Sequence, residues 1–403
     1  MKNTLMNFRV VLAIIFVATS FQFGFSQVTN PDELIGQDNA ITTAVPFLAI
    51  TPDARHAGLG DAGVATSPDA NSAYWNAGKL AFIDKKYGGT LSYTPWLGKI
   101  VNDMWVGYFS GFYKINREQA IAASIKYFDL GDITFNTGPN PGDVIGEFNP
   151  REFALDFTYS RMLSENLSIG GTVRYIHSNL TGAFTQIDAK AASGAAVDLG
   201  VYYTKPIQSA RNATLSIGAN ISNIGTKISY TDTQNKDFLP TNLRLGTAYT
   251  TELDPYNTLT FMVDFNKLLV PTPPIYDPNN PGVIIAGKDD RNKSILSGMF
   301  GSFSDAPGGF KEEIKEIMTS VGVEYWYNKL FAARLGYFNE AKTKGNRKYM
   351  TIGTGFRKNR FGFDIAYLVP TNKREHPLAE TIRFTLLLHI EETQQDKDES
   401  VTD

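Results

Sequence analysis

The sequence predicts an all-β protein, a fourteen-stranded antiparallel transmembrane β-barrel with an N-terminal plug segment. Apolar and polar side chains alternate over most of the chain after residue 87, as they do in strands with one apolar face. The connections between these segments alternate between long and short, which is typical of outer-membrane barrels. The chain also begins with the pattern of an exported protein.

Residues 1–26 have the features of a cleaved secretory signal. Lys2 and Arg9 precede the apolar run 10–18, and small residues lie at the expected cleavage positions before Gln27. This run is too short to cross a bilayer, which takes roughly 20 helical residues. We therefore expect an exported mature chain.

The composition excludes several kinds of chemistry and partner. The 403 residues include no Cys, which excludes a disulfide framework, a thiolate nucleophile, a Cys-ligated metal site and a lipoprotein anchor. There are 38 basic and 41 acidic side chains, a net charge of −3. This balance gives no electrostatic attraction to polyanions, so no nucleic-acid partner is expected.

Residues 27–87 differ from the rest of the chain because they are dense in small residues. Small side chains allow close backbone packing, as a plug inside a barrel needs. The run Gly58–Gly63 also matches a dinucleotide-binding fingerprint by its letters, but Ser67-Pro68 interrupts the helix that this motif requires. Close packing is the better interpretation of these glycines.

The alternating segments predict the strands of the barrel. In one of them Phe153, Leu155, Phe157 and Tyr159 alternate with small or polar residues. Fourteen such segments occur, an even number, as expected for a bacterial barrel. They are 88–95, 103–114, 119–129, 152–163, 167–179, 195–204, 213–224, 242–251, 258–269, 319–327, 330–338, 348–357, 361–369 and 381–390.

The alternation also predicts which side chains face lipid. Phe157, Leu199, Phe363 and Leu386 are expected to point outward, and Ala366 inward. Ten charged side chains fall on inward positions, where we expect either mutual ion pairing or a selectivity ring. They are Lys126, Arg174, Arg244, Arg334, Arg383, Asp156, Asp198, Asp264, Glu324 and Asp364.

The lengths of the connections predict how the barrel is oriented in the outer membrane. Long connections fall at 96–102, 130–151, 180–194, 225–241, 270–318, 339–347 and 370–380, with short ones between them. Since long loops face outward in outer-membrane barrels, we expect long loops outside the cell and both termini, including a polar tail at 391–403, in the periplasm.

The connection 270–318 is the best candidate for a partner contact. Its first part is rich in proline, which is expected to keep it from regular sheet pairing, and Glu312–Met318 is expected to form a helical turn. Apolar residues on a loop of this length suggest a docking surface, although they could instead cap the barrel mouth. The candidate contacts are Ile295, Leu296, Met299, Phe300 and Phe303, with Phe184 in the 180–194 loop.

Catalytic and metal sites are not expected. His56, His177, His376 and His389 have no paired metal spacing, and the sequence has no nucleophile-elbow motif. We therefore expect a protein that is not an enzyme and that has no cofactor.

Two stretches of the region 27–87 carry a resemblance to known families: Phe47–Arg55, which reads FLAITPDAR, and Asp69–Gly78, which reads DANSAYWNAG. They resemble the N-terminal region of FadL-type outer-membrane transporters, although the Asn-Pro-Ala-Gly turn of that family lacks its proline here. With Ser304–Ile317 (SDAPGGFKEEIKEI), they are more similar to the PorV family, outer-membrane proteins of type IX secretion with a FadL-like fold.

This resemblance implies a component that binds the C-terminal signal domains of secreted cargo. It implies three protein partners, a translocon pore protein, the cargo and a sortase-like attachment protein, in the outer membrane of a Gram-negative bacterium. The alternative is a FadL-like transporter of small hydrophobic compounds. The expected organisation is a signal peptide (1–26), a plug (27–87), a barrel (88–390) and a tail (391–403).

Overall fold

The structure is a computed structural model, which describes residues 39–390 apart from several short stretches. The stretches within this range that the structure does not describe are 99–100, 102, 137, 139–143, 181–189, 208–211, 232–235, 278, 281, 290–291 and 372–380. The expected signal peptide, the polar tail and Phe184 therefore lie outside the described residues. No helix in the described part of the chain is long and apolar enough to cross a membrane.

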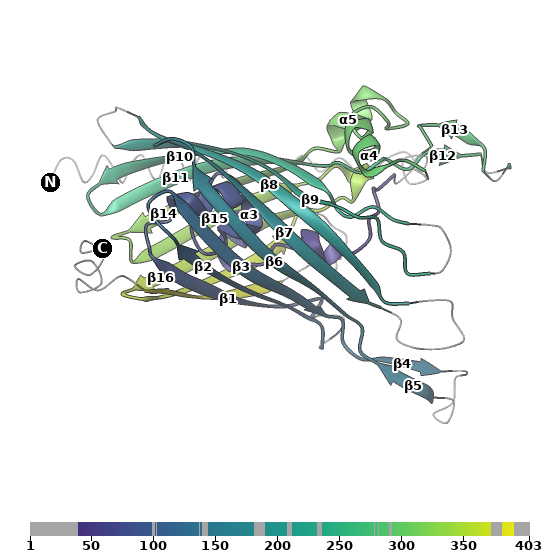
Figure 1. Cartoon of the computed structure of the whole chain (residues 1–403), viewed down its shortest axis with the longest axis horizontal. Coiled ribbons are helices and arrows are strands. Elements are labelled where there is room, and N and C mark those ends of the chain that lie inside the picture. Colours follow the sequence, from purple (N-terminus) through teal and green to yellow (C-terminus); the bar gives the residue numbers. More distant parts are fainter. Residues whose placement is uncertain are drawn as a thin grey trace. The chain divides into compact units, whose positions relative to one another are not determined.

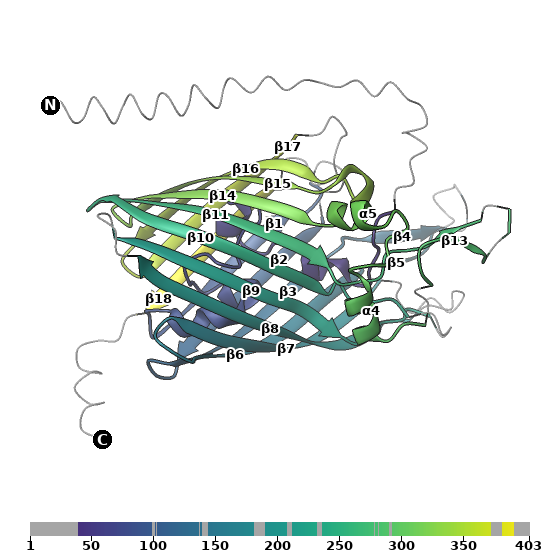
Figure 2. The ribbon, with the colours of Figure 1, turned by 90° about the horizontal axis from the view of Figure 1, so that it is seen from above.

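Fourteen antiparallel strands close into a barrel, as the sequence predicts (Figures 1 and 2). Closure occurs between β1 and β18, which pair from Tyr87↔Ile390 to Tyr93↔Phe384. A closed barrel leaves no unpaired strand edge facing lipid. The strands are β1 (Tyr87–Pro95), β2 (Trp105–Lys114), β3 (Gln119–Asp129), β6 (Arg151–Met162), β7 (Leu167–Asn179), β8 (Ala192–Ile207), β9 (Ala213–Gly225), β10 (Asn242–Asp254), β11 (Asn257–Leu268), β14 (Met318–Tyr327), β15 (Phe331–Asn339), β16 (Lys348–Lys358), β17 (Phe361–Pro370) and β18 (Ile382–Ile390).

The outer and inner faces of the strands have the expected register. Phe157 and Leu199 are 52% and 57% exposed on the outside, and Phe363 and Leu386 are exposed with them, whereas Ala366 is buried inside. Nine of the ten predicted inward charges are buried, and Arg244 is half-buried. The outer face is thus apolar and fits a bilayer, while the inner face carries the charges.

The long connections gather at one end of the barrel and carry additional elements (Figures 1 and 2). A two-stranded sheet, β4 (Ile133–Asn136) with β5 (Val144–Phe148), extends the connection after β3. The connection after β11 contains β12 (Ile275–Tyr276), β13 (Ile284–Ala286), α4 (Ile295–Gly301) and α5 (Phe310–Lys315).

This last connection differs from the sequence-based expectation in two ways. Its proline-rich part was expected to avoid sheet pairing, but Ile275 pairs with Ala286 and Tyr276 with Ile284, because these positions lie beyond Pro274 and keep their backbone N–H groups. The helical turn expected at Glu312–Met318 begins two residues earlier, at Phe310. Gly309 precedes it with a φ of 65°, a conformation that glycine adopts readily.

Residues 39–86, the inner segment, precede β1 and run inside the barrel (Figures 1 and 2). The segment forms four short helices: η2 (Pro46–Ala49), α2 (Ala54–Ala57), α3 (Ser72–Trp75) and η3 (Ala77–Phe82). Most of its residues are buried, including Trp75 and Lys79, which have no exposed surface. Its packing on the strands positions everything described below.

Candidate functional site

Arg55 links the inner segment to the charged inner wall. Its guanidinium lies 2.9 Å from Asp69 and 2.8 Å from Glu324 of β14. Glu324 also accepts a hydrogen bond from Arg334 at 2.7 Å, and Arg334 reaches Asp364 at 2.8 Å. Buried charges are tolerated where each has a partner in this way. The predicted lumen charges on this side therefore form a structural network.

The remaining lumen charges fall into three groups. Arg174 pairs with Asp156 at 2.7 Å and with Asp198 at 3.1 Å. Three others bind the inner segment instead: Lys126 donates to the carbonyl of Leu48, Asp264 accepts from the backbone N–H groups of Gly63 and Val64, and Arg383 lies 3.6 Å from Asp61. Arg244 has no carboxylate within 4.0 Å among the described residues. The mutual pairing expected from the sequence is thus only partly correct, since it omitted the inner segment.

Glycines let the inner segment touch the wall directly. A Cβ on Gly336 of β15 would lie 2.0 Å from the backbone nitrogen of Gly60, and one on Gly170 of β7 would lie 2.5 Å from the carbonyl carbon of Ala77. Gly60 itself has a φ of 67°. The glycines of the supposed dinucleotide motif therefore serve close packing. The inner segment contacts both β7 and β15, which belong to different parts of the wall.

A buried Asp–His–Thr arrangement lies inside this segment. Asp53 and Thr66 lie 2.7 Å and 2.9 Å from the two ring nitrogens of His56, and Lys79 donates to Thr66 at 2.7 Å. Burial lowers the pKa of Lys79 to about 8. The residue types resemble those of acyl-transfer enzymes, but His56 and Asp53 have no exposed surface and Thr66 only 1%. This arrangement holds the segment together.

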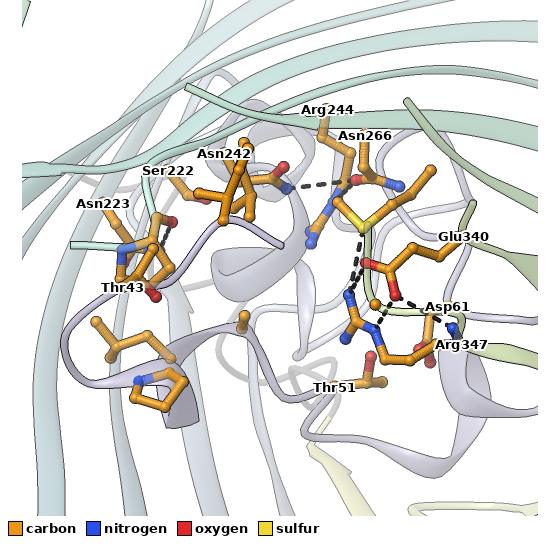
Figure 3. Close-up of a pocket in the computed structure, with 18 of the residues that line it drawn as sticks. Thr43, Thr51, Asp61, Ser222, Asn223, Asn242, Arg244, Asn266, Glu340 and Arg347 are labelled. Atoms are coloured by element: carbon orange, nitrogen blue, oxygen red, sulfur yellow. Dashed lines mark hydrogen bonds and ion pairs between the residues drawn. The ribbon is translucent and has the colours of Figure 1, made fainter. Parts of the chain in front are cut away.

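A cavity of about 330 Å³ lies between the inner segment and strands β7 to β15, beside the connection that precedes β16 (Figure 3). Most of its polar lining comes from Asn, Thr, Arg and Glu side chains. The residues labelled in Figure 3 are Thr43, Thr51, Asp61, Ser222, Asn223, Asn242, Arg244, Asn266, Glu340 and Arg347. Burial opposes the charge of Arg347, but the hydrogen bonds from Arg347 to Glu340 and the Glu340 charge outweigh burial and raise the pKa of Arg347.

The helix α5 at the same end turns its acidic side chains inward. Glu313 and Glu316 are buried and accept hydrogen bonds from Lys267 of β11 at 3.0 and 2.5 Å. Glu316 also lies 2.9 Å from Lys344. As a result Phe310 is left 78% exposed. This is the reverse of an ordinary surface helix, whose apolar face is buried.

The neighbouring helix α4 also exposes aromatic side chains. Met299 is buried. Gly298 lies so close to Phe238 that a Cβ added to Gly298 would be 2.8 Å from the Phe238 ring. Phe300 is 74% exposed. We call the exposed apolar residues of the two helices, of their junction and of the turn after α5 the rim surface: Leu296, Phe300, Phe303, Phe310, Ile314 and Ile317.

The rim surface includes only part of the set proposed from the sequence. Leu296, Phe300 and Phe303 are exposed, whereas Ile295 is half-buried and Met299 is buried. Phe310 and Ile314 were missed. Their i, i+4 spacing, with Glu313 between them, is visible in the sequence, but the helical turn expected there begins at Glu312 and so excludes Phe310.

The sequence of the chain matches the model of a known protein family. A family model described as "Type IX secretion system protein PorV" matches residues 34–275, more than half of the chain. The chain belongs to this family. The PorV family assignment and the barrel make it an outer-membrane component of type IX secretion, as the sequence resemblance implied. No curated protein matches the chain.

Several solved structures are similar in fold to this PorV-family chain. The toluene transporter TodX of Pseudomonas putida has 10% identity and a TM-score of 0.44, and covers 82% of this chain and 95% of its own. The Ralstonia pickettii toluene transporter TbuX has 12% identity, a TM-score of 0.46, and coverage of 84% and 98%. A FadL homologue from Pseudomonas aeruginosa has 12% identity, a TM-score of 0.44, and coverage of 84% and 98%. Likenesses this distant concern the fold alone.

Proposed function

We propose that this protein binds the C-terminal signal domains of secreted cargo and carries cargo from the translocon pore protein to a sortase-like attachment protein. In this proposal the protein is not an enzyme, the inner segment acts as a plug, and the barrel stays in outer-membrane lipid. The long connections face the cell exterior and the termini face the periplasm.

The observation that carries the proposal is the reversed polarity of α5. Its carboxylates are held inside by Lys267 and Lys344, while Phe310 and Ile314 are exposed on the opposite face. Exposed apolar clusters of this kind are typical of protein interaction sites, where buried aromatic anchors provide much of the affinity. Phe184 remains a proposed additional contact.

The ionic anchors favour a preformed docking surface. Besides Lys267, the connection is fixed by Lys293, which lies 3.1 Å from Asp305, and by Thr272, which donates to Glu316 at 2.6 Å. A surface that is already ordered loses less conformational entropy on binding than a free loop. The partners would therefore meet an ordered apolar patch.

The alternative function, transport of small hydrophobic compounds, calls for an apolar pocket. The cavity beside the inner segment instead has Arg244, Arg347, Asn242 and Asn266 in its lining. Transferring an apolar compound into such a site would desolvate polar groups without giving them partners. We therefore favour the secretion role.

The test is a double variant, Phe300→Ser with Phe310→Ser, which keeps Met299 and the ionic anchors in place. A deletion of 295–304 would be a less specific test, because it would also remove the buried Met299. The control is Phe361→Ser, since Phe361 is 70% exposed at the opposite end, next to the β16–β17 turn.

All three forms are expected to insert into the outer membrane. The double variant should lose copurification of translocon and cargo and should stop release of cargo to the surface, while the control should keep both. Normal secretion by the double variant would contradict the proposal. Insertion is checked by the heat-dependent electrophoretic mobility of the folded barrel.

A further inference from the structure

The cavity beside the inner segment holds one cation that lacks an ionic partner. Seven of its charged lining residues have an opposite charge within 4.0 Å. They are Arg174, Asp198, Glu316, Lys344, Glu340, Arg347 and Asp61. Arg244 has none among the described residues. Asp264, on the neighbouring strand, accepts hydrogen bonds from the backbone N–H groups of Gly63 and Val64 through its Oδ2, while its Oδ1 is buried without a hydrogen-bond partner among the described residues. The lining thus contains four cations and four carboxylates, and Arg244 is the cation that has no carboxylate at pairing distance.

Arg244 is also held in a fixed orientation. Its Nε donates to the Asn266 side-chain oxygen at 2.8 Å, and the same oxygen accepts from Asn242 at 3.4 Å. Its guanidinium carbon lies 4.6 Å from the centre of a Trp75 ring and 5.8 Å from that of Tyr74. Figure 3 shows the guanidinium pointing from the wall into the cavity. A cation positioned in this way is preorganised for an anion.

We propose that this cavity binds a small carboxylate, held by Arg244 and the neighbouring Asn side chains. The planar guanidinium matches a carboxylate. A single guanidinium without a carboxylate partner suits a monoanion better than a phosphate group, which carries about −1.5 to −2 near pH 7. The volume of about 330 Å³ and the Asn side chains beside Arg244 suit a short molecule that can form hydrogen bonds.

The carboxylate has two possible sources, a free organic acid or the C-terminal end of a peptide chain. The probes are therefore N-acetylglycine and N-acetyl-triglycine, each compared with its uncharged C-terminal amide. Binding to the purified full-length protein is measured by isothermal titration calorimetry. The inference does not depend on the docking role of the rim surface.

The wild-type protein should bind at least one of the two acids and neither amide. Binding of N-acetylglycine alone would identify a free acid as the source, and binding of N-acetyl-triglycine alone a chain end. Arg244→Gln should weaken binding by about tenfold or more, because it removes the cation of the described cavity lining that is free to pair with the ligand. Arg151→Gln is the matched control, because Arg151 is an exposed arginine outside the cavity and its loss should change nothing.

Arg244→Lys provides a second variant if the glutamine form does not fold. It keeps the charge but loses the planar fork, so binding should be weaker than in the wild type. The proposal is wrong if the wild-type protein binds neither acid, if it binds acids and amides equally, or if a folded Arg244 variant binds as tightly as the wild type.

Discussion

The packing of the inner segment on the wall can be tested with two adjacent glycines of β7. Gly170 points inward, and an added Cβ would lie 2.5 Å from the carbonyl carbon of Ala77 and 2.7 Å from the nitrogen of Gly78. Gly171 points outward, and its Cβ would meet only ordinary contacts at 3.6 and 4.0 Å. Neither glycine has a positive φ, so alanine is allowed by the backbone at both positions.

The expected cost of Gly170→Ala follows from these distances. To reach ordinary contact at 3.4 Å, η3 would have to move by about 0.9 Å, the difference between 3.4 and 2.5 Å. The shift would break the hydrogen bonds that join Gly78 to Ser160 and Ser168, and Ala81 to Ser160. At about 1 kcal/mol each, this loss is about 3 kcal/mol. Leaving η3 in place would cost about 1–3 kcal/mol through overpacking.

Because the protein takes the cheaper of these two routes, Gly170→Ala should be less stable than Gly171→Ala by about 1–3 kcal/mol. The entropic gain of replacing glycine by alanine, about 0.4–1 kcal/mol, is common to both variants and cancels in the comparison. The assay is reversible urea unfolding of the barrel in lipid vesicles. The folded fraction at each urea concentration is read from the heat-dependent electrophoretic mobility. Coinciding urea midpoints for the two variants would refute direct contact between η3 and β7.

Two further predictions concern the lipid face and a buried amine. Phe363→Arg should reduce the assembled fraction of the barrel, since an arginine on the lipid face costs about 2–4 kcal/mol at the bilayer midplane and less towards the end of the strand, where Phe363 lies, whereas Ala366→Ser should be mild; equal assembly would mean that the register is wrong. Burial lowers the pKa of Lys79 from 10.5 to about 8. Between these two pH values the unfolded chain binds more protons than the folded chain, so the free energy of unfolding rises with pH, by at most about 1.4 kcal/mol per pH unit. The thermal midpoint of the wild type should then rise relative to Lys79→Met from about pH 8 to about pH 10, and parallel curves would contradict a charged, buried Lys79 at neutral pH.

The sequence by itself determined the barrel, because the period of two along a strand is a local property. The side chains of 153, 155, 157 and 159 alternate with small or polar ones in the printed sequence, and the same residues line the outer face in the structure. The alternation of long and short connections follows from the antiparallel order in the same way. The family resemblance was likewise carried by contiguous residues such as Phe47–Arg55.

The partners of the inward charges were decided only by the tertiary structure. Arg55 and Glu324 are 269 residues apart and lie 2.8 Å from each other because the inner segment crosses the barrel interior, and no periodicity encodes that path. The exposure of α5 was equally hidden: Glu313 and Glu316 would ordinarily face solvent, and only the positions of Lys267 and Lys344 turn them inward. Local patterns fix which face of a strand a residue occupies, but the pairing of charges depends on distances between segments remote in sequence.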